Sequence, residues 1–412
     1  MGKGIITGKD IIKKISLFLM TFIVLFVSLI ISFCIPDSLL LGHISESKGY
    51  INYYEDYNWY VAFSERDIVL DNTDSDMLDW AIYDGTIGEI GPLKKALYIN
   101  GYPRFWHGYI VVLRFLLIFI NYTEIRYYNM LFLFLILGID LILMSKMLNT
   151  RTAMVFLLAM CMGRFFISAY CFSYIISFAI ALIAIWIILI RWKVISSSNL
   201  CNLFMLIGIL ENFFDFLTTP LLTWGLPIMI VILLYLNDDN LSSGVIWKRT
   251  INYSLFWLLG YAGMWLMKWL VGTVILQSNI FSDAADQIYF RTRGNESYPV
   301  DYFEMLSKNI SKITLPNVSW KIFISVLLLF WCMFAAVLVK RHGDIRKLTL
   351  FISMALFPYV WYIVLVNHSQ IHAIFTYKLQ IISLFSYFAS FFYCIDWKHD
   401  LCKKNVGDDS TI

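Results

Sequence analysis

The chain has 412 residues, of which 59% are hydrophobic, 17% aromatic and 15% charged, and its mean hydropathy is +0.70. This composition excludes a water-soluble globular protein and indicates a polytopic membrane protein. The 32 basic and 29 acidic residues give a formal net charge of +3, which is too small and too dispersed to indicate a nucleic-acid partner. The seven cysteines form no CxxC pair, so neither a disulfide framework nor a zinc site is predicted.

Apolar runs near the length of a membrane span recur along the chain, since about 20 residues cross a hydrocarbon core of about 30 Å. They predict an all-α bundle of about ten spans that forms a single integral membrane domain over residues 1–412. We expect the spans at 15–34, 128–146, 152–168, 172–190, 200–218, 220–236, 252–276, 321–339, 348–366 and 379–395.

The basic residues between these runs predict an orientation. The first run follows three lysines and lacks a small-residue cleavage site before Pro36, so we expect a retained span with a cytoplasmic N-terminus. The Lys and Arg residues of the short connections then fall on the cytoplasmic side, together with the C-terminus. Two long loops, 36–127 and 277–320, are left on the outer face, and we expect them to contain interfacial helices and the chemistry.

The densest acidic run of the first outer loop holds four carboxylates within nine residues, namely Asp71, Asp74, Asp76 and Asp79. If a helix begins at Asp74, Thr73 can cap it, and its apolar face can dock on the bundle. The run is then a solvated, capped interfacial helix, which is the commoner case because acids often populate helix starts. Alternatively, one carboxylate near the membrane surface acts as general base on an acceptor hydroxyl.

A second acidic pair, Glu55 and Asp56, lies among four aromatic residues of the same loop. These rings can stack on a sugar that the carboxylates bind, or they can anchor the loop at the level of the lipid headgroups. The anchoring role is the commoner one for such aromatics.

Residues 100–109 and the apolar stretch that follows predict an interfacial helix with Arg104, His107 and Arg114. Guanidinium groups suit phosphate by charge and by geometry, so these side chains are candidates for binding a phosphate-bearing lipid on the outer leaflet. Snorkelling arginines beside aromatic anchors explain the pattern equally well.

Two histidines, His368 and His372, lie in the connection between the last two predicted spans, and their spacing of four places them on one face of a helix. Without a glutamate in HExxH order they make a poor zinc site. We therefore expect phosphate contact or hydrogen bonding by His368, His372 and Lys378. No metal site or other cofactor is predicted, and a requirement for a divalent metal is left open.

The fifth predicted span contains Glu211 and Asp215, which share a helix face. Carboxylates inside a membrane are costly and tend to face a cavity, a partner or a proton path. Asp215 lies close to Pro220 and is expected to help shape a cavity at the outer mouth of the span.

The second outer loop mixes charged and aromatic side chains, as a sugar-binding surface would. An amphipathic loop packed on the membrane has the same composition and is the favoured explanation. The residues are Asp283, Asp286, Arg291, Arg293, Glu296, Asp301 and Glu304 with Tyr289, Phe290, Tyr298, Tyr302 and Phe303.

The order of one span, a long acidic outer loop, a bundle of short-looped spans and a second outer loop resembles the GT-C class of integral membrane glycosyltransferases. Shorter stretches resemble motifs of bacterial GT-C-like proteins linked to surface polysaccharides. These are LDNTD at 70–74 with Met77 and Leu78, FWHGY at 105–109, DFLT at 215–218, and NHS at 367–369 with Ile371, His372 and FTY at 375–377.

The resemblance implies a lipid-linked sugar donor, carried on polyprenyl phosphate or diphosphate, and a cell-surface glycan or lipid-linked precursor as acceptor. It also implies an active site on the outer face of a bacterial cytoplasmic membrane. An acidic residue of the first outer loop serves as base in this class, and Asp74 is the match, with Asp71 and Asp76 as substitutes. The class usually places an acid pair close to the first span, whereas Glu55 and Asp56 lie about twenty residues beyond it.

In this interpretation, Asp74 deprotonates the acceptor hydroxyl, and Arg104, Arg114 or Lys378 stabilises the departing lipid phosphate. A polysaccharide repeat-unit polymerase is the nearest alternative, supported by Arg291 and Arg293. A flippase or transporter of lipid-linked oligosaccharide is the non-enzymatic alternative, supported by the two carboxylates of the fifth predicted span. No Walker loop is present in the sequence, so an ATP-driven pump is not expected.

Overall fold

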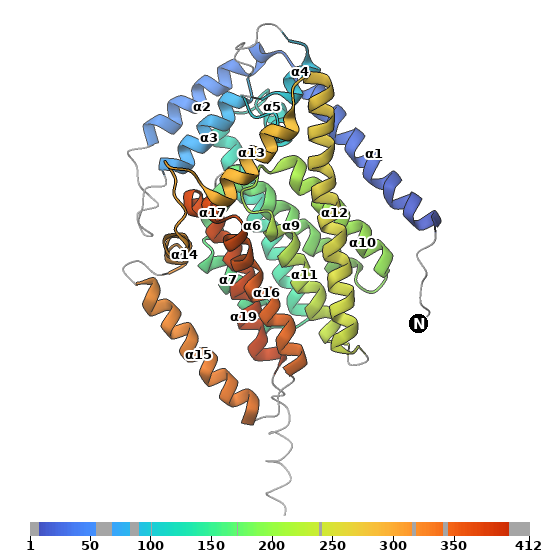
Figure 1. The fold of residues 1–412 in the computed structure, drawn as a ribbon, viewed down its shortest axis with the longest axis vertical. Coiled ribbons are helices and arrows are strands. Elements are labelled where there is room, and N and C mark those ends of the chain that lie inside the picture. The colour runs from blue at the N-terminus through green and yellow to red at the C-terminus, as the bar shows by residue number, and fades with distance from the viewer. Residues whose placement is uncertain are drawn as a thin grey trace, which may run out of the picture.

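The computed structural model describes residues 8–54, 68–82, 90–99, 101–170, 172–238, 241–314, 319–340 and 345–394. These residues form helices joined by turns, and no strand occurs among them (Figure 1). The all-α prediction is therefore confirmed for this part of the chain.

Four of the described helices are long and apolar enough to cross a membrane: α1 (Gly8–Ser32), α6 (Tyr122–Met147), α12 (Ser243–Leu276) and α16 (Ile345–Val364). The chain is thus a membrane protein by the length and composition of its helices. Four more helices contain shorter apolar stretches: α7 (Thr150–Met162), α9 (Phe172–Arg191), α11 (Leu221–Leu236) and α15 (Trp320–Lys340). The total of ten spans and the sides of the two termini stay predictions.

The shorter elements lie mainly in the two predicted outer loops. The first loop contains η1 (Asp37–Leu39), α2 (Leu41–Tyr54), α3 (Ile68–Trp80), α4 (Pro92–Leu97) and α5 (Tyr109–Leu116). The second contains α13 (Ile280–Arg293) and α14 (Tyr302–Ser311). The rest are α8 (Phe165–Tyr170), α10 (Ser197–Phe214), α17 (Val366–Ile371), α18 (Ala373–Thr376), η3 (Tyr377–Leu379) and α19 (Gln380–Tyr393).

Helices α2, α3, α4 and α5 gather at one end of the bundle, and α13 crosses near the same end between α12 and α17 (Figure 1). With eight residues, α5 is about 12 Å long at 1.5 Å per residue. It is too short to cross a hydrocarbon core of about 30 Å. The predicted interfacial segment after residue 108 therefore does not span the membrane.

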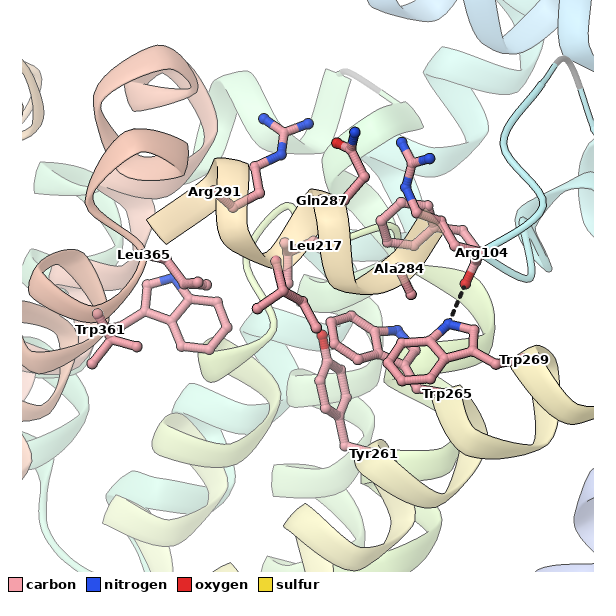
Figure 2. A pocket seen from close by; sticks show the side chains of 13 residues that line it. Arg104, Leu217, Tyr261, Trp265, Trp269, Ala284, Gln287, Arg291, Trp361 and Leu365 are labelled. Carbon is pink, nitrogen blue, oxygen red and sulfur yellow. Dashed lines mark hydrogen bonds between the residues drawn. The ribbon is translucent and has the colours of Figure 1, made fainter. Parts of the chain in front are cut away.

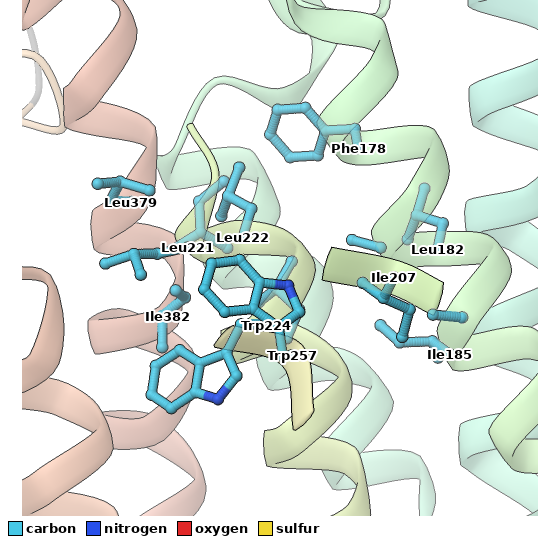
Figure 3. Close-up of a cluster of buried hydrophobic side chains, with 14 of the residues drawn as sticks. Phe178, Leu182, Ile185, Ile207, Leu221, Leu222, Trp224, Trp257, Leu379 and Ile382 are labelled. Carbon is cyan, nitrogen blue, oxygen red and sulfur yellow. The ribbon is translucent and has the colours of Figure 1, made fainter. Parts of the chain in front are cut away.

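Helix α11 forms the centre of the bundle, and all sixteen of its residues are buried. Its Leu221, Leu222 and Trp224 pack with Trp257 of α12 and Ile382 of α19 (Figure 3). A helix that is apolar on every side is stable only when protein or lipid covers it completely. The other helices are arranged around this core.

Helices α10 and α12 lie with their backbones in close contact, and two glycines make the contact possible. A Cβ atom on Gly208 would lie 2.1 Å from the carbonyl oxygen of Trp257, and one on Gly260 would lie 2.2 Å from that of Met205. Both positions must lack a side chain at this separation. Small residues at such contacts are the usual way in which membrane helices gain packing energy.

Arg114 of α5 ties the first outer loop to the end of α1. Its guanidinium group is fully buried. The Nε atom donates to the carbonyl oxygen of Ser32 at 2.9 Å, and Nη1 lies 2.7 Å from a carboxylate oxygen of Asp37. Two further donors bond the carbonyl oxygens of Ala81 and Ile35. One side chain thus joins α1, the turn after it, α3 and α5.

Helix α3 begins earlier than the sequence suggested. It runs from Ile68, so Thr73 lies inside the helix and does not cap it. The apolar residues before Asp71 extend the helix toward the N-terminus, and Asp74 and Asp76 lie near its middle. The expected helix start at Asp74 is therefore wrong.

Gly260→Ala is expected to lower the free energy of unfolding by about 1–3 kcal/mol, because the added methyl group overpacks the contact between α10 and α12. Thermal unfolding of the purified protein in detergent, followed by tryptophan fluorescence, measures this effect. Gly138→Ala on α6 is the control, since a Cβ atom there meets nothing within 4 Å. Equal melting temperatures for the two variants would contradict the close contact.

Candidate functional site

Asp74, the predicted base, lies inside the protein. Its side chain is fully buried, and one carboxylate oxygen accepts hydrogen bonds from Arg126 of α6, from Nη2 at 2.7 Å and from Nε at 3.3 Å. A proton on this carboxylate would weaken the buried ion pair with the guanidinium group. The geometry gives Asp74 a structural role, namely to attach α3 to α6.

Asp76 occupies the other side of α3 and is exposed. Partial burial and the neighbouring charge of Asp79 raise its pKa above the usual value of 3.8, and Lys48 opposes this shift. Asp76 also interacts electrostatically with Tyr109 of α5, whose hydroxyl group is buried and has no hydrogen-bond partner among the described residues. An accessible carboxylate with a raised pKa is better suited to accept a proton than one held in a buried ion pair.

Three other acidic candidates are less informative. Glu55 and Asp56 lie outside the described residues. Asp71 belongs to α3, but its side chain is also outside the described part. Their predicted roles stay predictions.

His107 lies within a box of aromatic rings. Its ring centroid is 5.6 Å from that of Trp80, 6.5 Å from Tyr102 and 6.0 Å from Tyr109, and Phe216 stacks on it at 6.1 Å. Trp80 follows Asp76 by one helical turn, so both lie on the same face of α3. Asp76 is therefore on the side of α3 that faces these rings.

Burial, and then the positive charges of Lys268 and Arg104, lower the pKa of His107 to about 3, although a hydrogen bond to Phe105 opposes the shift. The ring is neutral at pH 7. Its Nδ1 atom lies 3.2 Å from the carbonyl oxygen of Phe105, so Nδ1 carries the proton and Nε2 keeps a lone pair. This neutral imidazole can accept a hydrogen bond but does not supply charge to a phosphate.

The backbone at His107 is also constrained. Its φ of 53° is in the left-handed region, and the amide of the following Gly108 donates to the carbonyl oxygen of Phe213 at 2.8 Å. A Cβ atom on Gly108 would lie 2.3 Å from the ring of Phe213. The absence of a side chain at Gly108 thus allows this segment to lie against the end of α10.

Next to this box lies a cavity of about 280 Å³ that is lined by Arg104 and Arg291 (Figure 2). We call it the arginine cavity. Apart from these two side chains and Gln287, its wall is mainly apolar and aromatic. The other lining residues are Phe105, Leu217, Tyr261, Trp265, Trp269, Ala284, Ile288, Trp361, Val364 and Leu365.

The two arginines are compensated differently. Arg104 forms an ion pair with Asp283 of α13 at 3.1 Å, and its guanidinium group lies 4.9 Å from the ring centroid of Tyr102. Arg291 forms no ion pair within the described ranges. Burial lowers its pKa, and the nearby positive charge of Arg104 lowers it further. The arginine cavity therefore carries an uncompensated positive charge, which favours an anionic ligand.

His372 positions Arg291. The Nη1 atom of Arg291 donates to Nε2 of His372 at 2.6 Å. Burial, and then the charge of Arg291, lower the pKa of His372 to about 4, so the ring is neutral at pH 7 and accepts this bond. The ring centroid of His368 lies 4.9 Å away. The two histidine rings thus lie together, and that of His372 contacts the guanidinium group of Arg291.

His368 binds the loop between α10 and α11. Its Nε2 atom lies 3.0 Å from the carbonyl oxygen of Leu217, a residue with a φ of 75°. Burial is the main reason that the pKa of His368 lies well below its usual value. Its Nδ1 atom and the Nε1 atom of Trp361 are buried and have no hydrogen-bond partner among the described residues. Such groups are commonly satisfied by water or by a ligand.

Asp215 and Lys378 hold the surrounding structure. Asp215 accepts the backbone amide of Thr218 at 2.8 Å and also its hydroxyl group, which fixes the turn before α11. Lys378 is buried, with Nζ 4.3 Å from the ring centroid of Tyr377 and 3.5 Å from the carbonyl oxygen of Ile374. Neither residue lines the arginine cavity. Glu211 of α10 is fully buried, and its Oε1 atom accepts from Ser177 at 2.9 Å.

Sequence reasoning missed the aromatic wall of the arginine cavity. Tyr261, Trp265 and Trp269 recur every four residues on α12, and this spacing could have identified one face of a helix. Trp80 and Phe216 have no comparable signal, because distant segments bring them together. In the described part of the chain, no group of three or more His, Cys, Asp or Glu side chains is placed to hold a metal ion.

Comparisons with family models, curated proteins and solved structures found no match for this chain.

Asp74→Asn is expected to lower the free energy of unfolding by about 3–5 kcal/mol, because it breaks the buried ion pair with Arg126. Asp76→Asn, two residues away and exposed, is the matched control and should change stability by less than about 0.5 kcal/mol. Thermal unfolding in detergent measures both. If Asp74→Asn proved as stable as Asp76→Asn, the buried ion pair would not be the link between α3 and α6.

Proposed function

We propose that the protein is a membrane glycosyltransferase of the GT-C type that moves a sugar from a polyprenyl-phosphate-linked donor to a glycan or lipid-linked acceptor. The observation that carries this proposal is the arginine cavity, which combines two guanidinium groups with an apolar, aromatic wall. A lipid phosphate has the same two properties, because it joins an anionic head to a hydrocarbon chain. Arginine suits phosphate oxygens through its fixed, multiple donors.

The phosphate lies against Arg291 and Arg104 in this proposal. Arg291 has no carboxylate partner in the described structure, and His372 holds its guanidinium group in place. The unpartnered indole Nε1 atom of Trp361 offers a further donor in the same wall. Together these donors stabilise the negative charge that grows on the phosphate as the bond to the sugar breaks.

Asp76 serves as base in place of Asp74. Its carboxylate accepts the proton of the acceptor hydroxyl while the hydroxyl oxygen attacks the anomeric carbon, and the lipid phosphate departs with the bonding electrons. Trp80, on the same face of α3, contacts Tyr102, and the guanidinium group of Arg104 stacks over Tyr102. This chain of contacts connects the base to the arginine cavity.

The site belongs to the end of the bundle that holds α3, α5 and α13 (Figure 1). We place this end outside a bacterial cytoplasmic membrane, with both chain termini inside and about ten spans in total. The distribution of basic residues between the apolar runs supports this orientation.

Cells that lack the protein and carry the Asp76→Asn variant should lose one sugar from the surface glycan, without shortening of the polymer, because the acceptor hydroxyl is no longer deprotonated. Glycan composition and chain length, compared with cells that carry the wild type, measure this. Asp286→Asn, another exposed acid, is the control and should restore the sugar. Full rescue by Asp76→Asn at normal protein levels would overturn the assignment of the base.

The rate of sugar transfer should fall as the external pH drops through the pKa of Asp76, because only the ionised carboxylate accepts a proton. Asp79 raises this pKa, so Asp79→Asn should lower it and move the acid limb to lower pH. Incorporation of labelled sugar in pulse-labelled cells measures the shift. The pH series runs from about 4, near the ordinary pKa of an aspartate, to about 7. A limb that stays in place or moves upward would contradict the role of Asp76.

Asp283→Asn should strengthen the binding of a lipid phosphate, because it releases Arg104 from its ion pair. The gain is expected on the order of fivefold, since a partly exposed ion pair is worth up to about 1 kcal/mol. Binding of farnesyl phosphate to the purified protein measures it, and Asp286→Asn, on the same helix, controls for the change in net charge. Unchanged or weaker binding by Asp283→Asn alone would remove Arg104 from the phosphate site.

A repeat-unit polymerase is the second candidate, because Arg291 lines the arginine cavity and Arg293 is exposed close by on α13. Such an enzyme would also bind a phosphate-bearing lipid. Replacing both arginines with alanine should then shorten the polymer ladder and leave the sugar composition unchanged.

Transport of a lipid-linked oligosaccharide is the non-enzymatic candidate. The Oε2 atom of Glu211 has no hydrogen-bond partner among the described residues, as expected of a carboxylate that faces a cavity or proton path. Loss of transport in Glu211→Gln with Asp215→Asn, together with full rescue by Asp76→Asn, would favour this reading.

A further inference from the structure

A second cavity, of about 490 Å³, adjoins the arginine cavity and lies between α11, α12 and α16. We call it the apolar cavity. Trp361 and Val364 of α16 line both cavities, so these two side chains form a wall that the cavities share. The lining contains no charged residue. It consists of Leu221, Trp224, Ile232, Trp247, Thr250, Ile251, Ser254, Leu255, Trp257, Leu258, Leu350, Ser353, Met354, Phe357, Val360, Trp361 and Val364.

The two cavities follow the same faces of two helices. On α12, the lining residues run from Trp247 in the apolar cavity to Trp269 in the arginine cavity, a length of about 33 Å at 1.5 Å per residue. On α16, they run from Leu350 to Val364, or about 21 Å. The two adjoining cavities together therefore extend from the phosphate donors along much of the bundle.

Most side-chain polar atoms of the apolar cavity are bonded within the protein; among the described residues, Nε1 of Trp361 and Oγ1 of Thr250 have no hydrogen-bond partner. The indole Nε1 atom of Trp224 donates to Ser254 at 2.8 Å, and that of Trp257 donates to Thr223 at 3.2 Å. The hydroxyl group of Ser353 donates to the carbonyl oxygen of Leu350 at 2.8 Å. These side chains present rings and carbon atoms to the cavity, which suits a hydrocarbon.

From the shared wall at Trp361 and Val364, we infer that the apolar cavity holds the prenyl chain of the donor whose phosphate lies against Arg104 and Arg291. This inference rests on the proposed function. One apolar cavity adjoins one phosphate site, which fits a lipid with a single chain better than a phospholipid with two. In a bilayer the chain gains no hydrophobic free energy by leaving the lipid, so the shape of the cavity must supply the selectivity.

Two photoreactive probes test the inference on the wild-type protein in lipid nanodiscs. Both are geranylgeranyl phosphates with a diazirine group, placed beside the phosphate in the first probe and at the far end of the chain in the second. We expect the first to label α13 and the second to label the α12 and α16 residues of the apolar cavity. Unlabelled geranylgeranyl phosphate should remove both labels, whereas dioleoyl phosphatidic acid should remove neither.

Ser353→Phe fills the apolar cavity and provides a second test. It should abolish labelling of α12 and α16 by the second probe while labelling of α13 by the first probe persists. Ser325→Phe on α15 is the matched control, because Ser325 also donates to its own helix, at 2.8 Å, but is exposed outside the cavity. It should leave both labels unchanged.

The outcomes separate the inference from the proposed function. If neither probe labels the protein in a way that geranylgeranyl phosphate removes, the phosphate site itself is wrong and the inference falls with it. If the first probe labels α13 but the second labels lipid-facing helices such as α6 at random, only the prenyl site is overturned. Removal of the second label by dioleoyl phosphatidic acid would instead make the apolar cavity a general acyl-chain site.

Discussion

The close approach of α10 and α12 at Gly208 and Gly260 sets the relative position of two parts of the wall of the arginine cavity. Beyond this contact, α10 ends and the turn with Leu217 begins, while α12 continues with Tyr261 and its aromatic neighbours. Neither wall can shift alone, because the two backbones are already in contact. Packing at two glycines therefore determines how far the turn at Leu217 lies from the rings of α12.

The sequence predicted the features that depend on local pattern. Long apolar runs gave the all-α class, and the spacing of His368 and His372 placed their rings together. It did not predict which of the nearby acids is buried. The partner of Asp74 is Arg126, 52 residues further along the chain, and no local pattern encodes such a pairing. The role of Arg114 was equally hidden, because its partners come from α1, the following turn and α3.

Asp74 and Asp76 illustrate why a cluster of acids is hard to interpret from sequence. Two residues along a helix correspond to a rotation of about 200°, so the two side chains lie on nearly opposite faces. One face of α3 packs against the bundle and places Asp74 beside a guanidinium group. The other face leaves Asp76 exposed, next to Asp79 and Lys48. Identical carboxylates in one acidic run thus acquire different environments from helix geometry alone.

The left-handed backbone at His107 and Leu217 restricts which residues evolution can place there. Both have positive φ, and each lies in a turn beside the aromatic box or the arginine cavity. An L-residue in this conformation costs about 1–2 kcal/mol, and a β-branched residue more. Glycine or asparagine would relieve that cost but would remove the imidazole that stacks on Phe216, or the leucine side chain that lines the arginine cavity. At these two positions, side-chain contacts therefore oppose substitution by glycine or asparagine. The backbone conformation alone would favour those residues.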